Sequence, residues 1–584
     1  MSELISESPY KLGENGHSEY TWSNNIRERI IQLSFQLTRA TATATATKTA
    51  TTQLSTITSD ILSQLKHDYQ SQIIPNEVFV EYMSIMFRLI GHTRDIIDGK
   101  GEYNLSYMLL SVWLKHYPDL AFFAFDLFVL GDSETHPYGS WKDVKYMIDY
   151  MEQQTILEDD RTNLHLFTDY AISLINNQLR IDMVSDNPSL AAKWVPREKS
   201  RFADLFGHLA RNYFPEYEAS AFTEISIIKA QTKAKMDYRK VITGLNKKLD
   251  TVQIKQCANT WSTIEPTKQT SITMHKQKKA FLNLNKRGQQ RSTSDDRIAC
   301  GAKFREFAEK AATGEVSVKG QRIGLNDFTK DALDIIRRQQ QHSSETQLLN
   351  AQWVNNSLQN GALGKMIAMV DVSGSMSGEP MNAAIALGIR IAEKSLLGKR
   401  IITFSAAPTW VNLDSEPTST FVSMVQHVSA ADWGMNTNFV AALNLILDAI
   451  ISQKMDSNDV EDMVLTILSD MQIDAADNSF GSGPNSLMEL IENKYAEAGI
   501  RVCGKPYKPP HILFWNLRST SGFPTLSTQR NTSMMSGFSP VLLNLFCEQG
   551  LDGLQSCSPW SLFVKSLEKE RYGVMDAKIR EVFC

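Results

Sequence analysis

The sequence predicts a multidomain protein of the α plus α/β class. An all-α, helical-repeat (solenoid-like) region should precede an α/β domain with a mostly parallel central sheet. A chain of 584 residues is too long for one hydrophobic core. Apolar residues recur at helical spacing through the first half, and after about residue 363 buried strands alternate with helices. We therefore expect the helical region at 1–345, a connection at 346–362, and the α/β domain with C-terminal helices at 363–584.

Composition excludes several classes of protein. The chain is 42% hydrophobic and 21% charged, which is typical of a soluble globular protein. Six scattered cysteines without a C-x-x-C pair argue against a disulfide framework and a zinc ribbon. The first residues lack the basic start and apolar run of a signal peptide, and the apolar window 119–130 is too short to cross a bilayer. We expect a cytoplasmic protein with no membrane partner.

Helices separated by short breaks are predicted for much of the first 262 residues. Stops at Gly91, Pro118 and Gly131 separate the first of them. The predicted helices cover about 76–90, 104–117, 119–130, 141 onward, 161–180, 200–213 and 222–262. Successive helices predict antiparallel pairs stacked as in an α-solenoid, and a compact bundle is the alternative because no residue pattern repeats clearly. The Ala/Thr run at 40–52 is interpreted as a loop or a helix extension.

The stretch 229–291 is strongly basic. It holds fifteen Lys and Arg against three acidic residues, a net charge of +12 in a chain that totals −5. Such asymmetry is typical of a surface that contacts a phosphate backbone, and Tyr238, Trp261 and Phe281 could stack on bases. The alternative is a solvated helix face that pairs with the acidic remainder of the chain.

After a polar run at 340–360, which favours a connection between domains, the pattern changes to strands and helices. The predicted strands cover about 366–370, 400–404, 410–413, 463–468, 511–516 and 532–535. The predicted helices cover about 380–394, 419–428, 438–453 and 485–498. This alternation predicts helices on both faces of the sheet and a binding site at the carboxyl ends of the strands.

Oxygen-bearing side chains follow two of these strands. Asp371, Ser373 and Ser375 alternate directly after the first strand, and Gly374 allows the backbone to turn tightly between the serines. Thr437 precedes a predicted helix, and Asp470 follows the strand at 463–468. Hard divalent cations prefer oxygen ligands, so these five residues predict a site for Mg²⁺ or another divalent cation such as Mn²⁺.

Catalytic motifs are missing around this stretch. Met376 stands where a nucleophile elbow would have serine, and Ser373 where a phosphoaspartate hydrolase would have a second acid. There is no Walker loop and no G-x-G-x-x-G motif. We therefore expect a binding site and no enzyme activity, with a metal-dependent hydrolase as a further alternative.

The order Asp371-x-Ser373-x-Ser375, then Thr437, then Asp470 resembles the metal-ion-dependent adhesion site of von Willebrand factor type A domains. The resemblance implies a Rossmann-like type A domain in which these residues hold Mg²⁺ directly or through water. One coordination position would stay open for a carboxylate from a protein partner. The residue after the threonine is often Asp in such domains and is Asn438 here, which reduces the charge around the metal.

Several stretches together resemble the family called domain of unknown function 2828. They are 91–102, 139–143, 192–199, 238–249, 469–472 and 535–539. The layout also resembles the TROVE module of the Ro autoantigen, in which a ring of helical repeats binds structured and misfolded small RNAs on a basic inner surface. This likeness implies an RNA-binding helical region.

Candidate RNA contacts combine the basic residues of these stretches with those of 229–291. They are Arg94, Lys100, Lys142, Lys193, Arg197, Arg239, Lys240, Lys247, Lys248, Lys276, Lys278 and Lys279. The alternative for the first five is turn geometry, capping and ion pairing within the chain. We expect a non-enzymatic binding protein for structured or single-stranded RNA, with a metal-dependent protein scaffold without RNA binding as the alternative.

Overall fold

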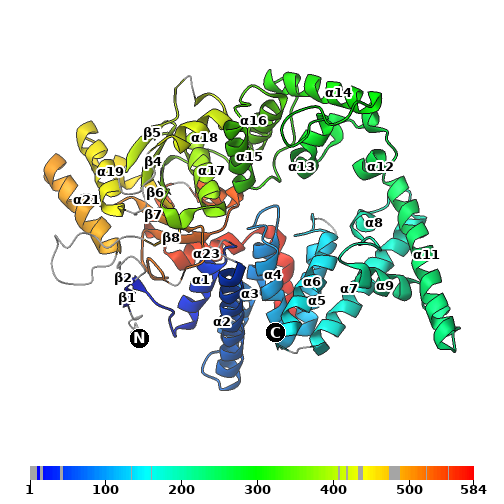
Figure 1. Ribbon diagram of the computed structural model, residues 1–584. Helices are drawn as coiled ribbons and strands as arrows, with labels where there is room; N and C mark the ends of the chain where they lie inside the picture. The colour runs from blue at the N-terminus through cyan, green and yellow to red at the C-terminus, as the bar shows by residue number, and fades with distance from the viewer. Residues whose placement is uncertain are drawn as a thin grey trace.

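The computed structural model describes residues 10–12, 18–39, 44–132, 135–158, 161–404, 408–415, 418–431, 438–472, 487–520, 522–549 and 551–584. Helices fill the N-terminal part, and a six-stranded sheet with flanking helices forms the C-terminal part (Figure 1). The α plus α/β class predicted from the sequence is confirmed at this level. Every helix within the described ranges is too short or too polar to cross a membrane.

Eleven helices precede residue 250 in the described part of the chain. A small antiparallel pair, β1 (Tyr10–Leu12) and β2 (Ser18–Tyr20), lies before them. The helices are α1 (Ile26–Gln36), α2 (Ala44–Gln70), α3 (Asn76–Arg94), α4 (Asn104–His116), α5 (Pro118–Val129), α6 (Lys142–Glu158), α7 (Arg161–Val184), α8 (Ala191–Trp194), α9 (Ala203–Tyr213), α10 (Pro215–Ala219) and α11 (Glu224–Lys248). Residues 40–43 lie outside the described residues, and the rest of the Ala/Thr run forms the start of helix α2.

Several predicted helix ends differ from the structure by four residues or more, and two of these differences have a clear physical reason. Helix α3 continues through Gly91 to Arg94. Gly91 does not end the helix but allows close packing, since a Cβ there would lie 2.6 Å from the Met575 sulfur. The predicted helix at 222–262 breaks after Lys248, where Asp250 adopts a φ of +42°. The chain then forms α12 (Val252–Cys257), η1 (Trp261–Thr263), η2 (Pro266–Lys268), α13 (Ser271–Phe281), α14 (Asp295–Ala312), α15 (Leu325–Arg337) and α16 (Ser344–Ser357).

The predicted connection at 346–362 is largely the helix α16. Ser343 caps this helix by accepting a hydrogen bond from the Thr346 amide, and its Trp353 is buried. The Trp353 ring stacks on Phe421 at 3.9 Å and donates to the Glu393 carboxylate. Helices α15 and α16 therefore pack on the sheet part. The polar composition of 340–360 misled the prediction because buried apolar residues such as Trp353 are few there.

The sheet has the order β5-β4-β3-β6-β7-β8, and β5 alone runs antiparallel to its neighbour. Its strands are β3 (Lys365–Asp371), β4 (Arg400–Phe404), β5 (Thr409–Asn412), β6 (Met463–Ser469), β7 (His511–Asn516) and β8 (Thr532–Ser536). All six predicted strands are confirmed to within a residue or two.

Alternate residues of the central strands face opposite layers. Ile367 and Met369 pack with α19 (Phe439–Gln453) and α21 (Leu487–Cys503) on one face. Ala368 and Val370 pack with α17 (Glu379–Lys394) and α18 (Phe421–Ser429) on the other. The remaining elements of this part are η3 (Gly374–Met376), α20 (Ser457–Glu461), η5 (Pro540–Leu543), α22 (Asn544–Gln549), η6 (Leu551–Ser556), α23 (Pro559–Leu567), η7 (Glu570–Tyr572) and α24 (Gly573–Phe583).

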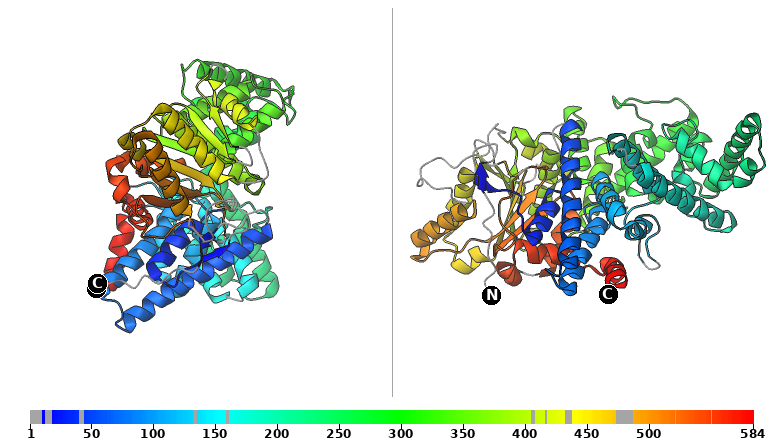
Figure 2. Two further views of the ribbon diagram at one scale, coloured as in Figure 1. Left: turned by 90° about the vertical axis from the view of Figure 1, so that its left-hand side faces the viewer. Right: turned by 90° about the horizontal axis from the view of Figure 1, so that it is seen from below.

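The helical part is attached to the sheet part at both of its ends. At one end α1 packs on β8 and α24 packs on α3. At the other end α14 leads into α15 and α16 on the sheet part. Figure 1 shows the sheet at the left, α11 at the right, and helices running between them along the bottom and along the top. The left view of Figure 2 shows the sheet part above the blue N-terminal helices, with the red C-terminal helices alongside. The helical part and the sheet part thus form a closed ring, which we call the closed circuit.

A buried ion pair joins the end of α3 to the start of α6. The Arg94 guanidinium donates to Asp143 at 2.6 and 2.9 Å, and both side chains are almost inaccessible to solvent. Asp143 also accepts from the Tyr107 hydroxyl at 2.6 Å and the Ser140 amide at 2.8 Å. These four hydrogen bonds compensate the buried carboxylate, so the pair holds three helices together.

Asp143→Asn should lower the free energy of unfolding by about 3–5 kcal/mol, because it leaves the Arg94 charge buried without a partner. Urea unfolding followed by circular dichroism measures the effect. Arg239→Ala is the control, since it removes an exposed pair with Glu198 and should cost about 1 kcal/mol or less. Equal effects of the two substitutions would contradict this account of Asp143.

Candidate metal and anion sites

Two carboxylates meet at the carboxyl ends of adjacent strands. Asp371 is the last residue of β3, Asp470 directly follows β6, and these strands pair in parallel with Val370 beside Leu468. Both aspartates are fully buried. Burial, together with the Asp470 charge, raises the pKa of Asp371, and burial also raises the pKa of Asp470. Two adjacent buried acids are costly unless a cation or donors compensate them.

Donors around the two carboxylates come from the same strand ends. The Ser469 hydroxyl donates to Asp371 at 2.5 Å, and the Ser373 amide donates to its other oxygen at 2.9 Å. The Ser373 and Ser375 hydroxyls lie 3.1 Å apart in the η3 turn. Four of the five predicted metal ligands are therefore brought together.

The fifth predicted ligand, Thr437, lies outside the described residues. Its neighbour Asn438 is the N-cap of α19 and accepts a hydrogen bond from the Ala441 amide at 2.9 Å. This capping role gives a physical reason for asparagine at that position.

Sequence reasoning missed two residues of this site, Ser469 and Arg518. The Arg518 guanidinium donates to the Ser375 carbonyl at 2.8 Å and lies 3.4 Å from Asp470. The sequence does hold a signal for this arginine, because Arg518 follows the end of β7, the strand next to β6. The loop that carries Arg518 is held by α1: the Thr520 amide donates to Gln36 at 2.9 Å, and Asn516 donates to the Phe35 carbonyl at 3.0 Å.

The donor set fits a hard divalent cation. The described residues contain no group of three or more His, Cys, Asp or Glu side chains that could hold a metal ion. The site offers instead two carboxylates and two serine hydroxyls, and Mg²⁺ commonly takes one or two carboxylates and keeps its waters. Asp371, Ser373, Ser375 and Asp470 would hold the ion, which would supply a local positive charge. Arg518 partly neutralises Asp470 in the present arrangement.

Three of the twelve basic candidates for RNA contact are buried and cannot reach an RNA in this structure. Arg94 is paired with Asp143, Lys278 is paired with Asp331, and Lys100 lies at the junction of the two parts. Two of the aromatic residues proposed to stack on bases, Tyr238 and Phe281, are also buried. A charge count along the sequence cannot distinguish these residues from exposed ones.

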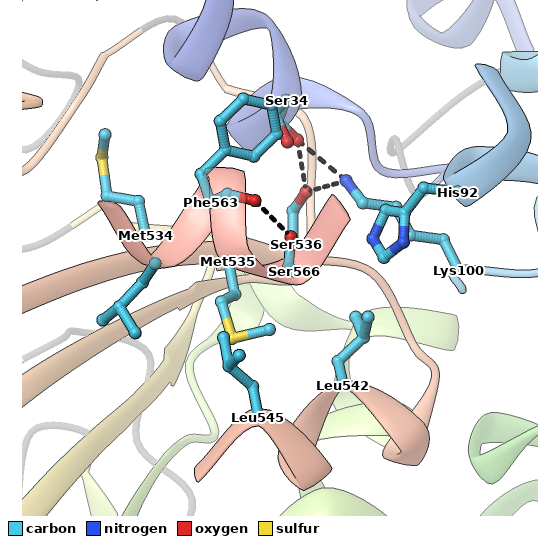
Figure 3. Close-up of a pocket in the computed structure, with 11 residues that line it drawn as sticks. Ser34, His92, Lys100, Met534, Met535, Ser536, Leu542, Leu545, Phe563 and Ser566 are labelled. Atoms are coloured by element: carbon cyan, nitrogen blue, oxygen red, sulfur yellow. Dashed lines mark hydrogen bonds between the residues drawn. The ribbon is translucent and has the colours of Figure 1, made fainter. Parts of the chain in front are cut away.

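Lys100 ties the helical part to the sheet part (Figure 3). Its ammonium donates to the Ser34 carbonyl at 2.8 Å, the Leu37 carbonyl at 3.2 Å and the Ser536 hydroxyl at 2.6 Å. Ser34, Lys100 and Ser536 line a cavity of about 20 Å³, enough for roughly one water, among Met and Leu side chains. Burial without a directly bonded carboxylate lowers the pKa of Lys100 to about 7.

The candidates on α11 are exposed, and some carry partners. Arg239 pairs with Glu198 at 3.2 Å, and Lys240 pairs with Asp237 at 2.8 Å. Lys247 and Lys248 are exposed near the end of the helix. On α13, Lys279 lies 3.5 and 3.6 Å from two carboxylates, whereas Lys276 is exposed. Part of the +12 charge is thus neutralised within the chain.

A lysine cluster surrounds the indole of Trp194. The ammonium groups of Lys142, Lys145 and Lys193 lie 4.5, 5.3 and 5.4 Å from the ring centroid. None of the three forms an ion pair with a carboxylate of the described residues. Burial lowers the pKa of each lysine. The charge of Lys276 lowers the pKa of Lys142 further, and the charge of Lys142 lowers those of Lys145 and Lys193 further. We call Lys142, Lys145, Lys193 and Trp194 the Trp194 cluster.

Sequence reasoning identified two of these lysines and missed Lys145. The signal was the spacing of Lys142 and Lys145, three residues apart at the start of α6, which puts both on one face of the helix. Arg197 is exposed just beyond the cluster. The positive charge of Lys276 on α13 also lowers the pKa of Lys142 on α6.

Comparison with known proteins gives two findings. A family model described as a domain of unknown function (DUF7788) matches residues 365–572, which begins at the first residue of β3. The chain is also similar to "Uncharacterized protein L728" of Acanthamoeba polyphaga mimivirus, with 27% identity over 510 residues. This similarity covers 84% of the chain and 80% of the mimivirus protein, so it extends over most of both parts.

Lys100 should make stability depend on pH. Its pKa is about 7 in the folded protein and about 10.4 in an unfolded chain, so the unfolded chain binds more protons between these values and stability rises with pH. Relative to Lys100→Met, the natural protein should gain about 2 kcal/mol of unfolding free energy from pH 7 to pH 9. Urea unfolding of both proteins at the two pH values measures this gain. An unchanged difference would show that Lys100 has an ordinary pKa.

Proposed function

We propose that this chain is a non-enzymatic RNA-binding protein whose helical part contacts RNA and whose sheet part carries a divalent-metal-dependent binding site. The observation that carries the RNA proposal is the Trp194 cluster. Three ammonium groups gather there without a carboxylate partner among the described residues. Phosphate groups would supply the missing negative charge and release counterions from the RNA.

The surroundings of the cluster support an RNA ligand. Tyr146 and Phe202 lie 5.3 and 5.8 Å from the Lys145 ammonium, so aromatic rings and cations alternate on this surface. Aromatic rings stack on bases while cations contact the backbone, and both features suit single-stranded or looped RNA. Lys276 adds charge from α13 on the opposite side of the circuit. This arrangement suits RNA held between the two rows of helices.

Replacing Lys142, Lys145 and Lys193 by Gln should weaken binding of a single-stranded RNA at least tenfold. It should also flatten the plot of log affinity against log salt by about 2, because each lost phosphate contact contributes about 0.7. Filter binding across a salt series measures both quantities. The control replaces Lys66, Lys505 and Lys508 by Gln, because these lysines are exposed outside the cluster and their loss removes the same charge. Equal losses in both variants would contradict a role for the cluster, and undetectable binding at low salt would overturn the RNA proposal.

The second candidate function is metal-dependent recognition of an acidic protein partner. The adjacent buried carboxylates of Asp371 and Asp470, with the hydroxyls of Ser373 and Ser375, favour it. With Thr437 these residues match the order of ligands in type A domains, in which the ion binds a partner's carboxylate. A bound Mg²⁺ or Mn²⁺ would present positive charge at the carboxyl edge of the sheet. The scaffold function without RNA binding would use this site alone.

Asp371→Asn should weaken Mn²⁺ binding at least tenfold, because one of the two anionic ligands is lost. Equilibrium dialysis and Mn²⁺ electron paramagnetic resonance measure the affinity and the number of ions bound. Asp459→Asn is the control, since Asp459 is half-buried and pairs with Lys365 outside the site. Failure of the natural protein to bind Mn²⁺ would overturn the metal proposal. Turnover of phosphoesters abolished by Asp470→Ala would instead favour a hydrolase.

A further inference from the structure

We infer that the Trp194 cluster binds a terminal phosphoryl group with two or more negative charges, such as the 5′ end of an RNA. This inference rests on the proposed RNA-binding function and goes beyond it by naming the chemical group that the cluster recognises. A chain of phosphodiesters would be matched by a row of separate cations. The cluster has a different geometry, because its three cations lie around one indole ring.

The gathering of the three lysines around Trp194 follows from the local structure. Helix α6 begins at Lys142 and puts Lys145 on the same face, while α8 ends at Trp194 and puts Lys193 beside it. All three ammonium groups lie within 5.4 Å of one ring centroid. Trp194 is thus the aromatic ring that the three positive charges share, and cation–π attraction holds the lysines there without neutralising them.

The nearby carboxylates are engaged elsewhere. Asp143 follows Lys142 in the sequence but is buried and bonded to Arg94, Tyr107 and the Ser140 amide. Asp149 pairs with Arg201 at 2.9 Å. Half-buried ammonium groups without an anion are costly, and the lowered pKa values of the three lysines express that cost. A ligand anion would recover this free energy.

Charge matching decides between the two kinds of phosphate. A phosphodiester carries one negative charge, whereas a phosphomonoester carries about −1.5 to −2 at pH 7 and three acceptor oxygens. Three ammonium groups around one ring match the charge of a monoester or a polyphosphate, whereas one diester would leave positive charge in excess. Lys276 on α13 and the exposed Arg197 can contact further phosphates of a strand that begins at the cluster.

The test compares one RNA sequence with three 5′ ends: hydroxyl, monophosphate and triphosphate. Fluorescence anisotropy with the full-length protein should give at least tenfold tighter binding for the monophosphate than for the hydroxyl, and tighter binding still for the triphosphate. Lys142→Gln with Lys193→Gln should abolish this preference, whereas Lys142→Arg, which keeps the charge, should retain it. Gln at Lys66 and Lys505 should leave it unchanged.

Competition distinguishes the sources of the phosphoryl group. Displacement of the RNA end by tripolyphosphate or ATP at similar concentrations would identify a free nucleotide or polyphosphate as a ligand and would still support a terminal-phosphate site. Equal affinity for all three RNA ends would overturn this inference and leave the RNA-binding proposal standing. Binding of none of the RNAs, with ATP binding that is lost in Lys142→Gln, would overturn RNA binding and retain the phosphoryl site.

Discussion

The last carbonyls of α1 need donors, and the rest of the structure depends on how they are satisfied. A helix leaves its final carbonyl groups without partners inside the helix. Here Lys100 donates to Ser34 and Leu37, Asn516 donates to Phe35, and Ser536 also donates to Ser34 at 2.8 Å. The donors come from the turn after α3 and from the ends of β7 and β8. One helix end therefore joins the helical part to the sheet.

The same contacts reach the candidate metal site. Gln36 holds the loop after β7 through the Thr520 amide and the Gly522 carbonyl, and this loop carries Arg518 to Asp470. The charge at the two carboxylates is thus set by a loop whose position depends on α1. A shift of α1 would move the guanidinium and change the electrostatics of the site. The helical part and the metal site are physically connected, although their proposed ligands differ.

Sequence reasoning succeeded where local pattern and burial agree. The strands of the sheet are apolar runs that end in acids or polar residues, so the pattern alone predicts that Asp371 and Asp470 lie side by side. It failed where the partner is distant. Nothing near Lys278 indicates that Asp331 lies beside it, and nothing near Arg94 indicates that Asp143 completes a buried pair. Such pairings depend on how helices pack, which spacing does not specify.

The link between Glu28 on α1 and the Ser527 amide joins residues 499 positions apart. At a synthesis rate of about 5–20 residues per second, roughly half a minute to two minutes pass between the two residues. Through that interval α1 can pack on α2, but its contacts with β8 and α23 and the partner of the Glu28 carboxylate are not yet available. The contacts that join α1 to the sheet part therefore form only after nearly all of the protein has been synthesised.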